Sequence, residues 1–113
     1  MLHADLRPTD LRALRDRLGL SQERLARVLD VSSRSVERWE AGTLPSDRRV
    51  IQLLDRLDEI ATLGTEVYGA DLARFMRLPR RALGGRTAAG ALVAGDIDEV
   101  LGLLARTAEG QLA

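Results

Sequence analysis

The amino-acid sequence predicts an all-α fold, and three observations carry this prediction. Apolar residues recur three or four positions apart over most of the 113 residues, the spacing that places them on one face of an α-helix. Ser, Thr or Asp precedes these stretches and Gly follows several of them, as expected at the two ends of a helix. Apolar and polar residues nowhere alternate over the length of a strand, and no repeat of about 20–50 residues is present.

The first helix is expected over about residues 10–18. Thr9 or Asp10 can cap its N-terminus, and Gly19 ends it. Its apolar face consists of Leu11, Leu14 and Leu18.

Two further short helices are separated by a tight turn. Ser21 is the expected N-cap of a helix over about residues 21–29, and Ser32 is the expected N-cap of a helix over about residues 33–41. Asp30 lies between them and tolerates the left-handed backbone that a sharp turn requires. The residues expected to pack these helices together are Leu25, Ala26, Leu29, Val31, Val36 and Trp39.

The rest of the chain predicts one long helix and three shorter ones. Asp47 precedes an amphipathic stretch that predicts a helix over about residues 47–62, and the pair Gly64-Thr65 is expected to break it. The helices expected after this break cover about residues 66–77, 88–93 and 96–109. The last of them is expected to bury Ile97, Val100, Leu101 and Leu104.

The composition excludes several kinds of chemistry. The chain has no cysteine and one histidine, so no disulfide, thiolate zinc site or thiol nucleophile is expected, and neither is a metal or a cofactor. The longest run without a charge, Thr87 to Gly95, has nine residues, far fewer than the ~20 apolar residues that span a bilayer. The N-terminal residues lack the apolar core of a signal peptide, so a cytoplasmic protein is expected.

All 17 basic residues are arginines, and 17 acids balance them in separate blocks. The net charge is +2 over residues 1–49, −4 over 50–73, +5 over 74–95 and −3 over 96–113. Biased genomic composition is one explanation for the absence of lysine; the other is that arginine bonds phosphate, guanine and carboxylate bidentately. The +5 block is a candidate surface for an acidic partner or a nucleotide, or else a solvated face satisfied by neighbouring acidic helices.

Residues 21–42 have the pattern of a helix-turn-helix, with Ala26 as the small residue where the two helices cross. Over about residues 7–62 the sequence resembles the Xre/lambda-repressor family. This resemblance implies an N-terminal DNA-binding bundle, residues 1–62, whose second motif helix enters the major groove.

The same resemblance implies a set of DNA contacts. Those assigned to base edges or phosphates are Gln22, Ser32, Ser33, Arg34, Ser35, Arg38 and, at the start of the next helix, Arg48 with Arg49. Arg34 and Arg38 lie one helical turn apart, on the side opposite the apolar residues, and an arginine can bond O6 and N7 of guanine together. Two half-sites need two motifs, so a dimer is expected; the alternative is a scaffold that no longer binds DNA.

The second half carries several short motifs in a fixed order. They are Phe-Met-Arg-Leu-Pro over residues 75–79, Arg-Ala-Leu-Gly-Gly-Arg-Thr over 81–87, Gly-Asp over 95–96 and Val-Leu-Gly-Leu-Leu over 100–104. Behind a helix-turn-helix, these motifs resemble the toxin-binding domain of the Xre/MbcA/ParS-like antitoxins, assigned to residues 63–113. Arg80 departs from the family pattern, in which Asn is common at this position.

This resemblance implies a type II antitoxin that binds a RES-domain toxin, an NAD-consuming enzyme, occludes its active site and represses its own operon. The residues expected to bind the toxin are Arg77, Arg80, Arg81, Arg86, Glu109, Gly110, Gln111, Leu112 and Ala113. The last five form a short tail whose carboxylates suit a cleft built for an anionic dinucleotide. Considered without the resemblance, the tail is a frayed helix end. The arginines of the +5 block can equally pair with the acids of the helix over residues 47–62.

Two other classes of protein compete with this interpretation. A stand-alone repressor whose second half only dimerises is the alternative, and a RES-type gene beside this one would distinguish the two. Enzyme activity is not expected, because residues 96–99 form an acidic helix start and residues 84–87 lack the strand and the Gly-Lys-Ser/Thr of a phosphate loop. The expected assembly is a homodimer or a larger toxin–antitoxin hetero-oligomer.

Overall fold

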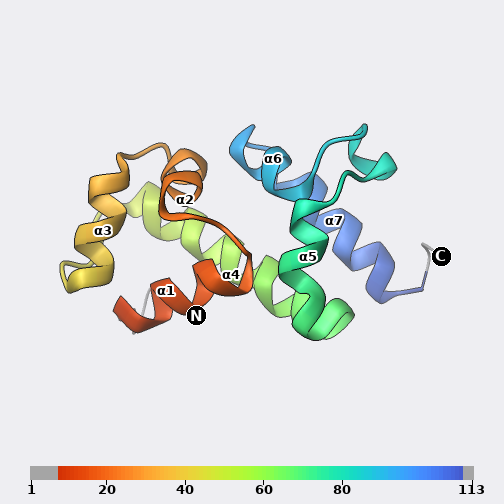
Figure 1. Ribbon diagram of the computed structural model, residues 1–113, viewed down its shortest axis with the longest axis horizontal. Helices are drawn as coiled ribbons and strands as arrows, with labels where there is room; N and C mark the ends of the chain where they lie inside the picture. The colour runs from red at the N-terminus through yellow and green to blue at the C-terminus, as the bar shows by residue number, and fades with distance from the viewer. Residues whose placement is uncertain (1–7, 111–113) are drawn as a thin grey trace.

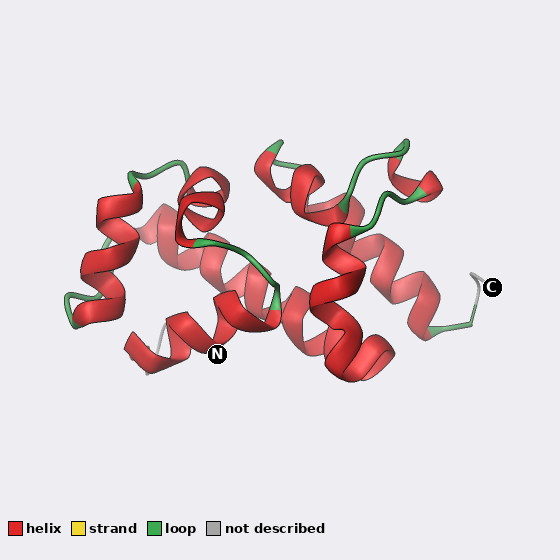
Figure 2. Cartoon of the chain, viewed as in Figure 1, coloured by secondary structure: helices red, strands yellow, loops and turns green. Residues whose placement is uncertain are grey.

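The computed structural model describes residues 8–110, and this part of the chain is all-α, as predicted (Figure 1 and Figure 2). In chain order its helices are α1 (Pro8–Arg17), α2 (Gln22–Leu29), α3 (Ser33–Ala41), α4 (Arg48–Tyr68), the 3₁₀-helix η1 (Gly69–Asp71), α5 (Leu72–Arg77), the 3₁₀-helix η2 (Arg81–Leu83), α6 (Ala88–Val93) and α7 (Ile97–Ala108). Within these residues there is no strand, only an isolated bridge between Pro79 and Thr87. None of these helices combines the length and apolar character needed to cross a membrane.

The predicted N-caps of the helix-turn-helix are confirmed. The Oγ of Ser21 accepts a hydrogen bond from the backbone N–H of Arg24 at 3.0 Å, and the Oγ of Ser32 accepts one from Ser35 at 3.1 Å. These bonds satisfy N–H groups that have no partner inside their own helices. Asp30 adopts the left-handed conformation (φ 55°, ψ 52°), so α3 can leave α2 at a sharp angle.

The predicted break at Gly64-Thr65 is wrong. Helix α4 continues without interruption to Tyr68, and the expected helix over 66–77 is divided between the end of α4, η1 and α5. Gly64 is buried, and a Cβ atom on it would lie 2.5 Å from Cδ1 of Leu72. Glycine occurs here because α4 and α5 approach closely, and the proposed division between residues 62 and 63 falls within one helix.

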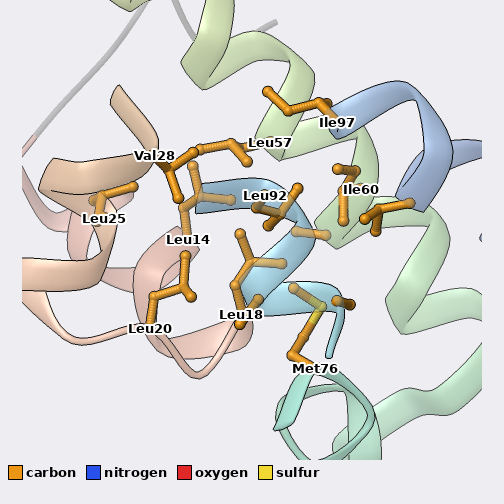
Figure 3. Close-up of a cluster of buried hydrophobic side chains, with 14 of the residues drawn as sticks. Leu14, Leu18, Leu20, Leu25, Val28, Leu57, Ile60, Met76, Leu92 and Ile97 are labelled. Carbon is orange, nitrogen blue, oxygen red and sulfur yellow. The ribbon is translucent and has the colours of Figure 1, made fainter. Parts of the chain in front are cut away.

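The two halves of the chain share one hydrophobic core. In Figure 3, side chains of α1 and α2, among them Leu14 and Val28, gather with Leu57 of α4, Leu92 of α6 and Ile97 of α7. Because the core is continuous, side-chain packing fixes how the helix-turn-helix sits against the second half.

Close backbone approach and helix packing complete this arrangement. Gly19 (φ 65°) lies so near α5 that a Cβ atom on it would come within 2.9 Å of the Cβ of Ala73.

On α7, Leu101 was expected to be buried but is half-buried, and Leu103 is 5% exposed instead. Besides α4, α7 packs against α6 and η2, so more than one of its faces is covered.

Candidate DNA-binding and protein-binding surfaces

The second helix of the motif, α3, exposes two arginines. Val36 and Trp39 are buried in the core, and Arg34 and Arg38 lie on the opposite, exposed side. Within residues 8–110, Arg34 has no hydrogen-bond or ion-pair partner, and Arg38 makes one long contact from Nη2 to the Oγ of Ser35 at 3.4 Å. Both guanidinium groups are therefore able to bond an external acceptor.

Two serines at the start of α3 form a small hydroxyl cluster. The Oγ atoms of Ser32 and Ser35 are 3.0 Å apart and share one hydrogen bond. Since Ser32 also accepts the backbone N–H of Ser35, one hydroxyl hydrogen of the pair remains for an external acceptor such as a phosphate oxygen. Ser33 follows the cap and is half-buried.

Gln22, expected near DNA, is held by a charged network inside the bundle. Its Nε2 donates to Oε1 of Glu40 at 3.0 Å. The same carboxylate accepts two hydrogen bonds from Arg15, from Nε at 2.7 Å and from Nη2 at 3.1 Å, and Arg12 lies 3.6 Å away. The side chain of Glu40 is only 2% exposed, so this network fixes α1, the start of α2 and the end of α3 to one another.

The network shifts the pKa of both partners. Burial of the Glu40 carboxylate acts to raise its pKa, but the hydrogen bonds from Arg15 and Gln22 and the charges of Arg15 and Arg12 outweigh burial. The pKa of Glu40 is therefore below its ordinary value. The hydrogen bond to Glu40 also raises the pKa of Arg15. Sequence reasoning missed this pair because its members are 25 residues apart and no local pattern connects them.

Arg48 and Arg49 occupy the first turn of α4 and are exposed. The cap of this helix is Asp47, whose Oδ1 accepts the backbone N–H of Arg49 at 2.8 Å. Neither arginine side chain has an ion-pair partner in the described part of the chain.

In the second half, Arg86 is engaged inside the molecule. Its Nη1 donates to Asp96 at 2.7 Å, its Nη2 to Glu99 at 3.0 Å and its Nε to the carbonyl of Leu83 at 3.0 Å. The hydrogen bond to Asp96, with the nearby negative charges, raises the pKa of Arg86. Its acidic partners lie at the start of α7 and not on α4, so Arg86 joins the loop after η2 to α7.

The other expected toxin-binding residues differ in their surroundings. Arg77 and Arg81 are exposed and have no acceptor among residues 8–110, whereas the guanidinium of Arg80 lies over the ring of Phe75. Glu109 and Gly110 follow α7 and are exposed. The remaining expected residues, Gln111, Leu112 and Ala113, lie outside the described residues.

Comparison with known proteins covers both halves. Residues 11–61 match the helix-turn-helix family. The chain is 38% identical over 96 residues to the mycobacterial cidal antitoxin MbcA of Mycobacterium tuberculosis strain H37Rv and of Mycobacterium bovis, which covers 84% of this chain and 85% of those relatives. A chain of the crystal structure of the M. tuberculosis MbcT–MbcA toxin–antitoxin complex aligns with a TM-score of 0.74 and 30% identity over 96% of this chain and 99% of that one.

The helix pair α2–α3 and its exposed arginines define a helix-turn-helix protein with an additional helical half. The likeness to MbcA spans that additional half as well. The chain belongs to the Xre/MbcA/ParS-like family of antitoxins. Antitoxins of this kind and helix-turn-helix DNA-binding proteins are not enzymes.

Proposed function

We propose that this protein is the antitoxin of a type II system that binds and neutralises a RES-domain, NAD-degrading toxin. One observation carries the proposal: the likeness to a chain of the MbcT–MbcA complex extends over 96% of the residues, with a TM-score of 0.74. The likeness therefore includes the half that contains the expected toxin-binding arginines.

In this proposal, residues 63–113 occlude the toxin's active site. Arg77 and Arg81 support such a role because they are exposed and have no acceptor among the described residues. Arg86 has a positioning role, because its bonds to Asp96 and Glu99 at the start of α7 hold the loop that follows η2. The tail from Glu109 to Ala113 reaches into the toxin's cleft and presents carboxylates to it.

Residues 1–62, in the same proposal, bind operator DNA of the protein's own promoter and repress the operon. Exposed Arg34 and Arg38 face base edges together with Ser33. Ser32 and Arg48 face phosphates, and Ser35 lies near bases or phosphates. Gln22 helps to orient α3 through its hydrogen bond to Glu40 and lies near bases or phosphates. A homodimer, or a hetero-oligomer with the toxin, supplies two motifs for two half-sites.

Co-expression tests the proposal. The product of the neighbouring gene is produced with and without the tagged chain, and co-purification and cellular NAD are measured. We expect the pair to co-purify and NAD to be preserved only when both are present. Operator binding by a chain that neither captures the RES-domain protein nor preserves NAD would establish the stand-alone repressor instead.

A further inference from the structure

A cavity lies in the second half of the molecule, where the end of α4, α5, η2 and α7 meet. Its volume is about 450 Å³, and its lining includes Tyr68, Phe75, Arg80, Arg81, Leu103 and Thr107. The lining contains two arginines and no acidic residue. It therefore combines an apolar wall with an unbalanced positive charge.

Ring stacking holds one of these arginines in place. The guanidinium carbon of Arg80 lies 4.3 Å from the ring centroid of Phe75 and 6.0 Å from that of Tyr68. The two rings are themselves stacked, with centroids 4.4 Å apart and an interplanar angle of 23°. Three planar groups thus support one another, and the guanidinium has lost part of its hydration and much of its freedom before any partner arrives.

The guanidinium of Arg80 has hydrogen-bond donors that bond no acceptor among the described residues. Its Nε is buried without a hydrogen-bond partner, and its other nitrogens bond no acceptor within residues 8–110. Arg86, six residues later, uses all three of its nitrogens on internal acceptors. Because Nε is covered, the donors of Arg80 that an incoming acceptor can reach are its Nη atoms, which are not among the buried atoms without a partner.

We propose that this cavity receives an acidic side chain, Asp or Glu, of the protein partner. The inference rests on the proposed toxin binding and names the chemistry of one contact in it. The carboxylate pairs with the accessible Nη atoms of Arg80 and with Arg81, and the methylene groups of the acidic side chain pack against Leu103. A planar, pre-positioned guanidinium suits a carboxylate better than a freely rotating one, because less side-chain entropy is lost when the pair forms.

The position of the cavity favours a protein partner over a nucleic acid. Figure 1 shows α3, which carries the proposed base-contacting arginines, at one end of the long axis, and α5 and α7 toward the other end. DNA bound along α3 therefore lies far from Arg80. A phosphate of nucleic acid at this cavity is the competing outcome in the experiment below.

Calorimetric titration of the purified RES-domain protein into the full-length chain tests the inference. Arg80→Met keeps a long side chain over Phe75 but removes every donor, and Arg80→Lys keeps the charge but removes the planar fork. Arg106→Met, on the exposed side of α7 and outside the cavity, removes the same charge as a control. We expect about a tenfold or greater rise in Kd for Arg80→Met, a smaller rise for Arg80→Lys and little change for Arg106→Met, in line with a charged hydrogen bond.

Further measurements separate the possible outcomes. Operator affinity of the Arg80 variants is expected to match the wild type, and circular dichroism should show that both variants remain folded. Double-mutant cycles between Arg80→Met and alanine variants of the toxin's surface acids should identify one coupled Asp or Glu. If toxin binding were unchanged in both Arg80 variants, or if their operator binding were weakened, the inference about the cavity would be overturned and the proposed function would stand. No binding by the wild-type chain would overturn the proposed function together with it.

Discussion

The carboxylate of Glu40 accepts two hydrogen bonds from the guanidinium of Arg15, at 2.7 and 3.1 Å, and so ties the end of α3 to α1. The side chain of Glu40 is 2% exposed and that of Arg15 is 15% exposed, which shields the pair from water and salt. The helix that carries the proposed base contacts is thus anchored by an ion pair at its far end and by the core along its length. The orientation of α3 depends on both.

Replacing Glu40 with Gln is expected to lower the free energy of unfolding by about 1.5–3 kcal/mol, because Arg15 and Arg12 lose the carboxylate that compensates their charge. Urea unfolding followed by circular dichroism measures this. Glu37→Gln is the matched control, since Glu37 is exposed on the same helix without an ion pair in the described residues, and it should change stability by less than about 0.5 kcal/mol. Equal stability of the two variants would contradict a structural role for Glu40.

The same pair predicts a pH dependence of stability. The folded-state pKa of Glu40 is lowered, so its contribution is present above the pKa of an unfolded glutamate, about 4.3, and is lost as the pH falls through the folded-state value. The difference in unfolding free energy between the wild type and Glu40→Gln should be constant from neutral pH to about 5 and shrink below about 4. A difference that grew on acidification would show that the sign of the pKa shift is wrong.

Arg34→Ala should cost about 1–3 kcal/mol of specific operator binding and relax the preference at one base pair, because it removes a base-edge contact. Arg48→Ala should instead weaken binding to all sequences alike and reduce the salt dependence by about one phosphate contact. Titrations against operator and random duplexes at several salt concentrations separate the two effects. Arg106→Ala, on α7, serves as the charge control, and an unchanged operator affinity for Arg34→Ala would remove the base-contact assignment.

Removal of Gln111, Leu112 and Ala113 should leave the fold and operator binding intact while releasing toxin activity. The shared core of residues 8–110 is formed by residues up to Leu104, and the removed residues come after α7 in the sequence. NAD consumption by the RES-domain protein, measured with the full-length and truncated chains at equal concentration, provides the readout. Full inhibition by the truncated chain would count against a role of the tail in occluding the active site.

Gly64→Ala is expected to destabilise the protein, although alanine favours helices. A Cβ atom would lie 2.5 Å from Leu72 Cδ1, and Leu72 is buried at 2% exposure, so its methyl groups have no open space to move into. Such overpacking costs about 1–3 kcal/mol, against roughly 1 kcal/mol that alanine gains in a helix. Gly102→Ala is the control, because its nearest neighbour is Arg106 Nη1 at 3.4 Å; it should stabilise by about 0.5 kcal/mol. Thermal unfolding of both variants checks the opposite signs.

The caps and turns of the helix-turn-helix were predictable from sequence because they depend on short-range bonds. Ser21 and Ser32 each bond a backbone N–H three residues later, so the residue type and its position suffice to locate the helix start. The break at Gly64 failed as a prediction for the converse reason. A glycine that ends a helix and one that admits a neighbouring side chain look identical in sequence, and only the approach of Leu72 distinguishes them.

The arginines after residue 73 show a similar division. Their sequence carries a +5 block but does not say which charges have partners. The fold engages Arg86 with Asp96 and Glu99, stacks Arg80 on Phe75, and leaves Arg77 and Arg81 exposed. Four arginines that the sequence does not distinguish therefore differ in the fold. Arg86 positions a loop, Arg80 is a pre-oriented donor, and Arg77 and Arg81 are exposed to solvent.

By itself, the sequence determined the all-α class, the helix-turn-helix with its caps and the resemblance to the antitoxin family, because spacing and cap residues act over a few neighbouring positions. Only the tertiary structure decided that the halves share one core, that Gln22 and Arg15 converge on Glu40, and that Arg80 lines a cavity without bonding an acceptor among the described residues. These features join residues far apart in the chain. Their contacts depend on how the helices pack, which no local pattern specifies.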